Sequence, residues 1–424
     1  MKKKALVLLL ALSCTLSMAA CSGSESAGTF KAEDAFEEES TEVKEETTEE
    51  ETETESEEET ETEEETKKSS SNMPADLSDD IYDFQISIDG DIYQFPMWYS
   101  EFEALGWTYD GDSSETLSSN QYTTTEVWEK DGVKVYTGFA NLSMNTAPYS
   151  ECEVTGITLD KFYLEDCDWE IILPGGIQYG VSDADDIKEA YGTPTSDYDG
   201  DLYYSMTYEY DLYQEIQLYV YKESNTLEEI KIRNMVELEG ADNSVDETVP
   251  DVVKNYVAPT SVGDDFYSFN VEFEGNLYTL PCPVTEFLAN GFEINESDSD
   301  AVIAANNNGW IELKYNNMTL RALAYNYADY ATVLENCFVT SVETSEYDPQ
   351  FDLVIPGGIK RGDSESKLKK AINVFNYESE TSDSGYTYYE IYNPEGSILD
   401  SYDIVVKDGV ITSIEVSNSE SPEE

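Results

Sequence analysis

The segment FQISIDGDIYQFPMWYSEFEALGW at residues 84–107 returns 185 residues later as FNVEFEGNLYTLPCPVTEFLANGF at 269–292, with eight identical positions. The same offset places Cys152 on Cys337, and an offset of 182 then places LPGGI (173–177) on IPGGI (355–359). Each copy spans about 150 residues, which is far longer than the unit of a solenoid. The sequence therefore predicts two tandem homologous domains. The expected boundaries are repeat domain 1 at 79–233, a linker at 234–263, repeat domain 2 at 264–418 and a disordered tail at 419–424.

Each copy has short strand and helix signals. Alternating apolar residues around Asp89-Gly90 predict a β-hairpin, and Asp131-Gly132 and Asn316-Asn317 predict turns of two more. Ser182 and Ser364 are expected to be the N-caps of helices at about 183–191 and 365–373. The strands expected at the end of each copy are 202–210, 214–222 and 226–233, and 385–392, 401–407 and 410–417. These elements predict an α+β fold in which small antiparallel sheets are packed by one or two short helices.

The repeated LPGGI motif is Gly-rich and precedes a helix, as anion-binding loops do. It has neither the G-x-G-x-x-G spacing nor a following Gly-Lys-Ser/Thr. The second copy carries Lys360-Arg361 where the first has Gln178-Tyr179, so the copies share no charge for a common ligand. We interpret the motif as a corner between a strand and a helix, and we expect no cofactor.

The N-terminus has the three parts of a bacterial signal peptide. MKKK precedes an apolar run from Ala5 to about Leu16, and small residues lead to Cys21. Met18-Ala19-Ala20-Cys21 resembles a lipobox, which implies removal of residues 1–20 and a diacylglyceryl group on Cys21. Two acyl chains anchor a protein stably. The alternative is an ordinary secreted protein in which Cys21 merely follows the signal.

Residues 21–72 form a low-complexity Glu/Thr-rich segment. It has too few apolar residues to offset the entropy cost of folding, and like charges extend it. We expect a disordered tether that holds the folded part away from the membrane. A solubilising tail with no required reach is the alternative.

The folded part is strongly acidic. Residues 73–424 contain 70 Asp and Glu and 16 Lys and Arg, a net charge of −54. Such a surface repels phosphate backbones, so nucleic acid is excluded as a partner. It also repels anionic lipid, which leaves the lipid anchor as the attachment to the membrane. Cations and cationic partners remain compatible with this charge.

The chain contains no histidine. This excludes Ser-His-Asp and Cys-His triads and histidine-ligated zinc. Catalysis by paired carboxylates, as in glycoside hydrolysis, stays conceivable, but 91 Asp and Glu single out no pair. The 32 tyrosines and five tryptophans could contact sugars or peptides, or could simply be good strand residues.

Two further groups of residues are candidate sites. The turn DYDGD offers Asp197, Asp199 and Asp201 as weak candidates for a Ca²⁺ site, although it lacks EF-hand spacing and more simply forms a solvated turn. An exported protein with four cysteines in its folded part suggests disulfides. The pairing that keeps each repeat self-contained joins Cys152 to Cys167 and Cys282 to Cys337, and free buried thiols are the alternative.

Residues 180–194, GVSDADDIKEAYGTP, resemble the module of bacterial outer-membrane-assembly lipoproteins and β-lactamase-inhibitor proteins. The resemblance covers about 60 residues of each copy, and GDSESKLKKAINVFN in the second copy lacks the Gly-x-Pro. It implies helices packed on an antiparallel sheet and protein binding rather than catalysis. The whole two-part repeat is similar to surface lipoproteins of Gram-positive gut-type bacteria, which implies location rather than mechanism.

These features together predict a lipid-anchored protein on the extracellular face of the bacterial cell membrane. We expect a non-enzymatic binding protein with two duplicated modules and a protein or glycan partner at the cell surface, since two weak modules on one chain gain avidity. The alternatives are a carboxylate-based enzyme acting on glycans, a solute-binding receptor of a transporter, and an inhibitor of an extracellular enzyme.

Overall fold

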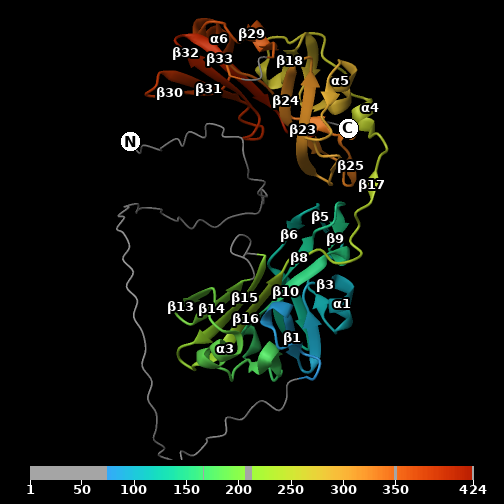
Figure 1. The fold of residues 1–424 in the computed structure, drawn as a ribbon, viewed down its shortest axis with the longest axis vertical. Coiled ribbons are helices and arrows are strands. Elements are labelled where there is room, and N and C mark those ends of the chain that lie inside the picture. The colour runs from blue at the N-terminus through green and yellow to red at the C-terminus, as the bar shows by residue number, and fades with distance from the viewer. Residues whose placement is uncertain (1–73, 166, 206–212, 348–350, 423–424) are drawn as a thin grey trace, which may run out of the picture. The chain divides into compact units, whose positions relative to one another are not determined.

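The computed structural model describes residues 74–165, 167–205, 213–347 and 351–422 (Figure 1). The predicted signal peptide, Cys21 and the tether lie outside the described residues. The fold is mostly β, with several small antiparallel sheets and short helices, in agreement with the expected α+β class. The α-helices in the described residues are α1 Tyr99–Ala104, α2 Lys161–Leu164, α3 Ala184–Tyr191, α4 Asp251–Lys254, α5 Val284–Ala289 and α6 Glu365–Ile372.

Residues 81–234 form two sheets and a short strand pair. A four-stranded sheet has the order β12-β11-β1-β2, and a larger sheet runs β13-β14-β15-β16-β10-β8-β7-β4, with β3 on β10 and β6 on β8 (Figure 1). The strands are β1 Gln85–Ile88, β2 Asp91–Gln94, β3 Met97–Trp98, β4 Thr108–Tyr109, β5 Thr116–Leu117, β6 Gln121–Tyr122, β7 Glu126–Lys130, β8 Val133–Asn141, β9 Ala147–Pro148, β10 Glu153–Asp160, β11 Ile171–Leu173, β12 Ile177–Gln178, β13 Ser196–Tyr198, β14 Asp201–Ser205, β15 Gln214–Tyr221 and β16 Thr226–Asn234.

Residues 245–417 form four sheets. Their orders are β19-β18-β28-β29, β20-β26-β24-β23-β21, β27-β33-β32-β31-β30 and β17-β25-β22. The strands are β17 Val245–Asp246, β18 Asn270–Phe273, β19 Asn276–Thr279, β20 Cys282–Pro283, β21 Glu293–Ile294, β22 Val302–Ile303, β23 Asn307–Tyr315, β24 Met318–Asn326, β25 Ala331–Val333, β26 Phe338–Val339, β27 Ser341–Thr344, β28 Leu353–Ile355, β29 Ile359–Lys360, β30 Tyr377–Thr381, β31 Tyr386–Tyr392, β32 Ser401–Lys407 and β33 Val410–Ser417.

The predicted hairpin turns are confirmed. Asp89 and Gly90 have φ of 51° and 87° between β1 and β2, and Asp131 and Gly132 have φ of 54° and 82° between β7 and β8. Positive φ at both central residues matches the right-handed twist of the strands that they join. The turn at Asn316 likewise joins β23 to β24.

The LPGGI motif is not a strand-to-helix corner. Gly175 and Gly176 have φ of 69° and 80°, and the turn that they form leads from β11 into the short antiparallel strand β12. Gly357 and Gly358 do the same between β28 and β29. Side chains disfavour two successive left-handed residues, so glycines permit this reversal. In both halves the helix begins several residues after the motif.

The helices α3 and α6 confirm the predicted helices, but only one cap matches the expectation. Ser364 caps α6 by accepting from the backbone N–H of Lys367. In α3 the cap is Asp183, whose carboxylate accepts from two backbone N–H groups, those of Asp185 and Asp186. The Ser182 hydroxyl instead accepts from the backbone N–H of Gln178. A carboxylate is favoured at this helix end because it also complements the helix dipole.

Buried side chains form two apolar clusters. One extends from Ile81 to Ile232 and the other from Phe266 to Val416. In the first, Phe102 stacks on Trp107 at 5.2 Å between ring centroids and meets Trp128 edge-on at 4.9 Å. Full burial of an aliphatic or aromatic side chain stabilises a fold by about 1.5–3 kcal/mol. Each cluster therefore stabilises the packing of the sheets that contribute to it.

The predicted linker contacts the folded parts along its length. The backbone N–H of Leu238 donates to Glu153, β17 pairs in parallel with β25, and the Tyr256 hydroxyl accepts from the backbone N–H of Thr279. This segment also contains the short helix α4. In the predicted tail, the backbone N–H of Ser419 donates to Asp400 at 2.8 Å. Ordered contacts therefore continue past residue 418.

Candidate functional site

An aromatic side chain is exposed on the hairpin of β23 and β24. Trp310 is 40% exposed, and its cross-strand partner Leu323 is 42% exposed. The next pair on the same face is Glu312 and Arg321. Directly opposite residues of an antiparallel pair present their side chains on one face. The hairpin therefore carries an aromatic ring, an aliphatic side chain and an ion pair on one surface, which we call the Trp310 face.

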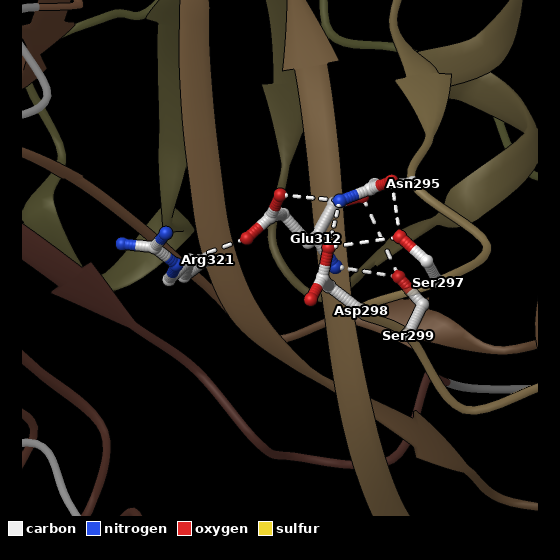
Figure 2. A network of polar contacts seen from close by, with 6 residues as sticks. All are labelled: Asn295, Ser297, Asp298, Ser299, Glu312 and Arg321. Atoms are coloured by element: carbon white, nitrogen blue, oxygen red, sulfur yellow. Dashed lines mark hydrogen bonds and ion pairs between the residues drawn. The ribbon is translucent and has the colours of Figure 1, made fainter.

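Polar side chains of the loop after β21 border the Trp310 face (Figure 2). Asn295 donates to Glu312 Oε1 at 2.7 Å and also to Asp298. The Ser297 hydroxyl lies 3.1 Å from Asn295 Oδ1 and 3.0 Å from Asp298 Oδ2. Ser299 accepts from the backbone N–H of Glu312 at 2.9 Å. These bonds fix the loop against β23.

Glu312 fixes the position of the Arg321 guanidinium group. Its side chain is 8% exposed, and its Oε2 accepts from Arg321 Nε at 3.0 Å. The Arg321 side chain is 64% exposed, and its terminal nitrogens extend away from the network (Figure 2). A planar guanidinium fixed through Nε keeps its other N–H donors free to meet an oxygen-bearing ligand.

The loop and the hairpin border a shallow, open depression of about 440 Å³. Its lining residues are Ser297, Asp298, Ser299, Asp300, Trp310, Glu312 and Arg321. Asp300 Oδ2 accepts from the backbone N–H of Trp310 at 2.6 Å. All three carboxylates therefore already bond to protein donors, and the arrangement suits recognition better than proton transfer.

The equivalent face of the first half has other residues. At the offset of 185, Trp310 corresponds to Thr125, Glu312 to Val127 and Arg321 to Tyr136. The Tyr136 hydroxyl lies 2.8 Å from that of Tyr163 in α2, so a local helix covers part of that face. The hairpins β7–β8 and β23–β24 thus present different residues at these positions.

The Ca²⁺ candidates each bond to a different protein donor. Asp197 pairs with Lys188 at 2.6 Å, Asp199 pairs with Lys222, and Asp201 accepts from Gln217 at 2.6 Å. Among the described residues no group of three or more His, Cys, Asp or Glu has an arrangement that could hold a metal ion.

A row of carboxylates crosses the sheet of β27 and β30–β33. Consecutive cross-strand partners are Glu378, Glu390, Asp403, Glu415 and Glu343. Partial burial, together with the charges of Asp403 and Glu343, raises the pKa of Glu415 to about 7. Like charges directly opposite each other destabilise a sheet. We call this set the acidic row.

The four cysteines of the folded part are free thiols in the structure. The disulfides considered between Cys152 and Cys167 and between Cys282 and Cys337 are not formed there. Burial raises the pKa of Cys152 and of Cys337 to about 12, and it also raises the pKa of Cys282. Cys167 is half-buried at the edge of the first cluster. Burial also raises the pKa of Cys167, so the four thiols differ in exposure: three are buried, and Cys167 is the accessible one.

Thiol titration should reflect this difference. In residues 22–424, a thiol reagent at pH 8 is expected to modify Cys167 alone under native conditions and all four thiols after unfolding without reductant. Cys167→Ser should remove the native reaction and leave three thiols in the unfolded chain. Finding two or no thiols in the unfolded wild-type chain would contradict free cysteines and support the disulfides.

None of the described helices is long and apolar enough to cross a membrane. The chain shows no significant similarity to a protein-family model, a curated protein or a solved structure. Function must therefore be argued from the residues. Sequence reasoning singled out none of Trp310, Glu312 and Arg321. At the offset of 185, residues 307–326 match residues 122–141 at a single identical position, Asn326 on Asn141, so comparing the copies gave no signal for these three residues.

Proposed function

We propose that this chain is a lipid-anchored, non-enzymatic binding protein on the outer face of the bacterial cell membrane. Its folded part comprises two tandem copies of one domain, and the second copy binds a glycan through the Trp310 face. The N-terminal signal pattern with Cys21 supports the anchor, and the acidic segment after it supports the role of a tether.

Repeated contacts support the duplication. Asn234 donates to the carbonyl oxygen of Phe95 at 2.9 Å, and Asn418 donates to that of Leu280 at 2.6 Å. Phe95 and Leu280 are equivalent at the offset of 185. The four-stranded sheets also have the same order, with β12-β11-β1-β2 matching β29-β28-β18-β19. A buried side chain that bonds the same backbone group in both halves is a specific coincidence of sequence and geometry.

The composition of the Trp310 face favours a hydroxyl-rich ring as its ligand, and the exposed Trp310 carries this proposal. An indole offers a flat apolar surface on which the C–H face of a sugar can pack. Asp300, Asp298 and Arg321 place acceptors and donors at its border. A mostly apolar ligand would cover the remaining solvent-facing donors and acceptors of these groups without bonding to them, which costs affinity. The acidic surroundings disfavour an anionic glycan, so we expect a neutral one.

The state of the carboxylates favours binding over hydrolysis. A glycosidase needs one carboxyl group as acid and another as base or nucleophile, both facing the substrate. At the Trp310 face, Glu312 has one oxygen bonded to Asn295 and the other to Arg321. Releasing Glu312 for catalysis would break both bonds.

Replacing Trp310 is expected to abolish most of the glycan binding. We expect residues 22–424 to bind neutral cell-wall or dietary glycans on an array, and Trp310→Ala to weaken that binding at least about tenfold because a central aromatic contact is lost. Tyr198→Ala is the matched control, since Tyr198 is an 80% exposed aromatic residue on another strand. The control should bind as the wild type does.

Other outcomes separate the alternatives. Release of reducing sugar that Asp300→Asn abolishes would establish an enzyme and overturn the proposal. Absence of glycan binding, with recovery of one defined protein from surface extracts, would support a protein-binding or inhibitory function instead. Equal glycan binding by Trp310→Ala and wild type would remove the Trp310 face as the site.

A further inference from the structure

A cavity of about 330 Å³ lies beside the first apolar cluster, under the segment that follows β16. Among its lining residues are Trp98, Leu142, Ser143, Ser150, Glu153 and Asp242. The lining combines an aromatic ring, hydroxyl groups and carboxylates. It contains no lysine or arginine.

Glu153 is the unusual residue of this cavity. It is 2% exposed, and its cross-strand partners are Trp98 on β3 and Ala140 on β8, which also line the cavity. Paired residues share one face of the sheet, so Trp98, Glu153 and Ala140 form a continuous row. Glu153 Oε1 accepts from the backbone N–H of Leu238 at 2.6 Å. Its buried Oε2 accepts from no described residue. A buried acceptor without a donor is costly, and a ligand that donates there would remove the cost.

The second half closes the same place with aromatic rings. The row equivalent to Ala140, Glu153 and Trp98 is Tyr325, Phe338 and Pro283. Tyr327, at the position of Leu142, lies 4.5 Å from Tyr325 and 5.4 Å from Phe338 between ring centroids. The framework therefore folds with this space filled. Keeping Ala140, Leu142 and a carboxylate at these positions in the first half is therefore not a requirement of packing.

We propose that this cavity binds a primary alkylammonium group, such as the end of a lysine side chain or a free alkylamine. An ammonium carries three donors and no acceptor, which matches Glu153 Oε2 and the serine oxygens. The Trp98 ring can attract the cation through its face. Glu151 and Asp242, which also line the cavity, repel anions. The volume lies at the lower end of the range for ligand pockets and fits a side-chain-sized group.

Binding should depend on pH. Burial and the charge of Glu237 raise the pKa of Glu153 to about 7, against the lowering effect of the bond from Leu238. The other titratable groups facing it are Glu151, Asp242 and Cys152, and burial raises the pKa of the Cys152 thiol to about 12. An alkylammonium stays protonated up to about pH 10. Affinity should therefore rise between pH 6 and pH 8 as Glu153 loses its proton.

The test uses N-acetyl-lysine methylamide and n-butylamine as probes and N-acetyl-norleucine methylamide as the uncharged isostere. Titration of residues 22–424 by calorimetry at pH 8 should show saturable binding of a charged probe and none of the isostere. Preference for the lysine probe over butylamine would assign a peptide source, and the reverse a free amine. Glu153→Gln should weaken binding about tenfold, because a charge-assisted bond is lost. Glu129→Gln, an exposed carboxylate outside the cavity, is the control.

A second variant guards against misfolding. Leu142→Tyr introduces the residue of the second half, so it should occupy the cavity and abolish binding while the circular dichroism spectrum stays that of the wild type. Absence of saturable binding of both charged probes, equal binding of the isostere, or unchanged affinity in Glu153→Gln would each overturn the proposal. None of these outcomes bears on the Trp310 face.

Discussion

Asn326→Ala is expected to lower the free energy of unfolding of the second half by about 3 kcal/mol. Asn326 is 2% exposed, and its Nδ2 donates to the carbonyl oxygens of Ile303, Ala304 and Tyr330 at 3.1, 3.0 and 2.7 Å. Its Oδ1 accepts from the backbone N–H of Ala328 at 3.0 Å. Alanine would leave these buried backbone groups without partners, and each unsatisfied group costs about 1–3 kcal/mol.

The same replacement at Asn141 tests the duplication. Asn141 donates to the carbonyl oxygen of Asn145 at 2.7 Å, and Asn145 corresponds to Tyr330 at the offset of 185. Asn141→Ala should therefore destabilise the first half by a similar amount. Hydrogen exchange of strands β8 and β24, measured by mass spectrometry, reports on each half separately.

The control is Asn308→Ala, an exposed position on β23 that should change stability by less than about 0.5 kcal/mol. A large loss of stability in Asn326→Ala with none in Asn141→Ala would show that the two asparagines differ in their structural role. That result would argue against copies of one domain.

The strands and turns were predictable because their signals are local. Asp89-Gly90 needs only its own backbone conformation to form a hairpin turn. The burial of the strands on either side follows the sequence less closely, since β1 buries Ser87 together with Ile86 and Ile88. The N-cap of α3 was less predictable, since Ser182 and Asp183 are adjacent and both can cap. The choice depends on Gln178, whose backbone N–H occupies the Ser182 hydroxyl.

The LPGGI motif is an example in which the local sequence did not predict the next structural element. Its glycines predict positive φ but not the element that comes next in the chain, and the return strand β12 forms only because β11 lies beside it. The Trp310 face could not be predicted from the sequence for a related reason. Trp and Arg are ordinary strand residues, and only the register between β23 and β24 places Arg321 opposite Glu312.

Register also creates the acidic row, in which burial of Glu415 and, after it, the charges of Asp403 and Glu343 make stability fall as pH rises. A carboxyl group whose pKa is higher in the folded than in the unfolded chain favours folding less once it is ionised. Glu415 has a folded pKa of about 7 against an ordinary value of 4.5, so its unfavourable contribution is absent below about pH 4.5 and complete above about pH 7. After allowance for solvent screening, we expect it to amount to about 1–2 kcal/mol at pH 8.

Glu415→Gln should therefore raise the free energy of unfolding at pH 8 by about 1–2 kcal/mol and leave it nearly unchanged at pH 4.5. Chemical denaturation followed by hydrogen exchange of β32 and β33 measures both values. Glu380→Gln on β30 lies opposite Tyr388 and outside the acidic row, so it should have little effect at either pH. Added salt should narrow the difference between wild type and Glu415→Gln, because it screens the repulsion.

The corresponding row of the first half suggests a substitution that should stabilise the second half more than Glu415→Gln does. There the positions of Glu378, Glu390, Asp403, Glu415 and Glu343 in the sheet are taken by Ser196, Tyr203, Gln217, Lys231 and Thr158. Lys231 donates to Gln217 at 3.2 Å, so the equivalent row is held together by attraction. Glu415→Lys should place a cation between Asp403 and Glu343 and stabilise the second half at pH 8 more than Glu415→Gln does. If Glu415→Lys were instead neutral or destabilising there, repulsion along the row could not contribute to the pH dependence, which would then come from the burial of Glu415 alone.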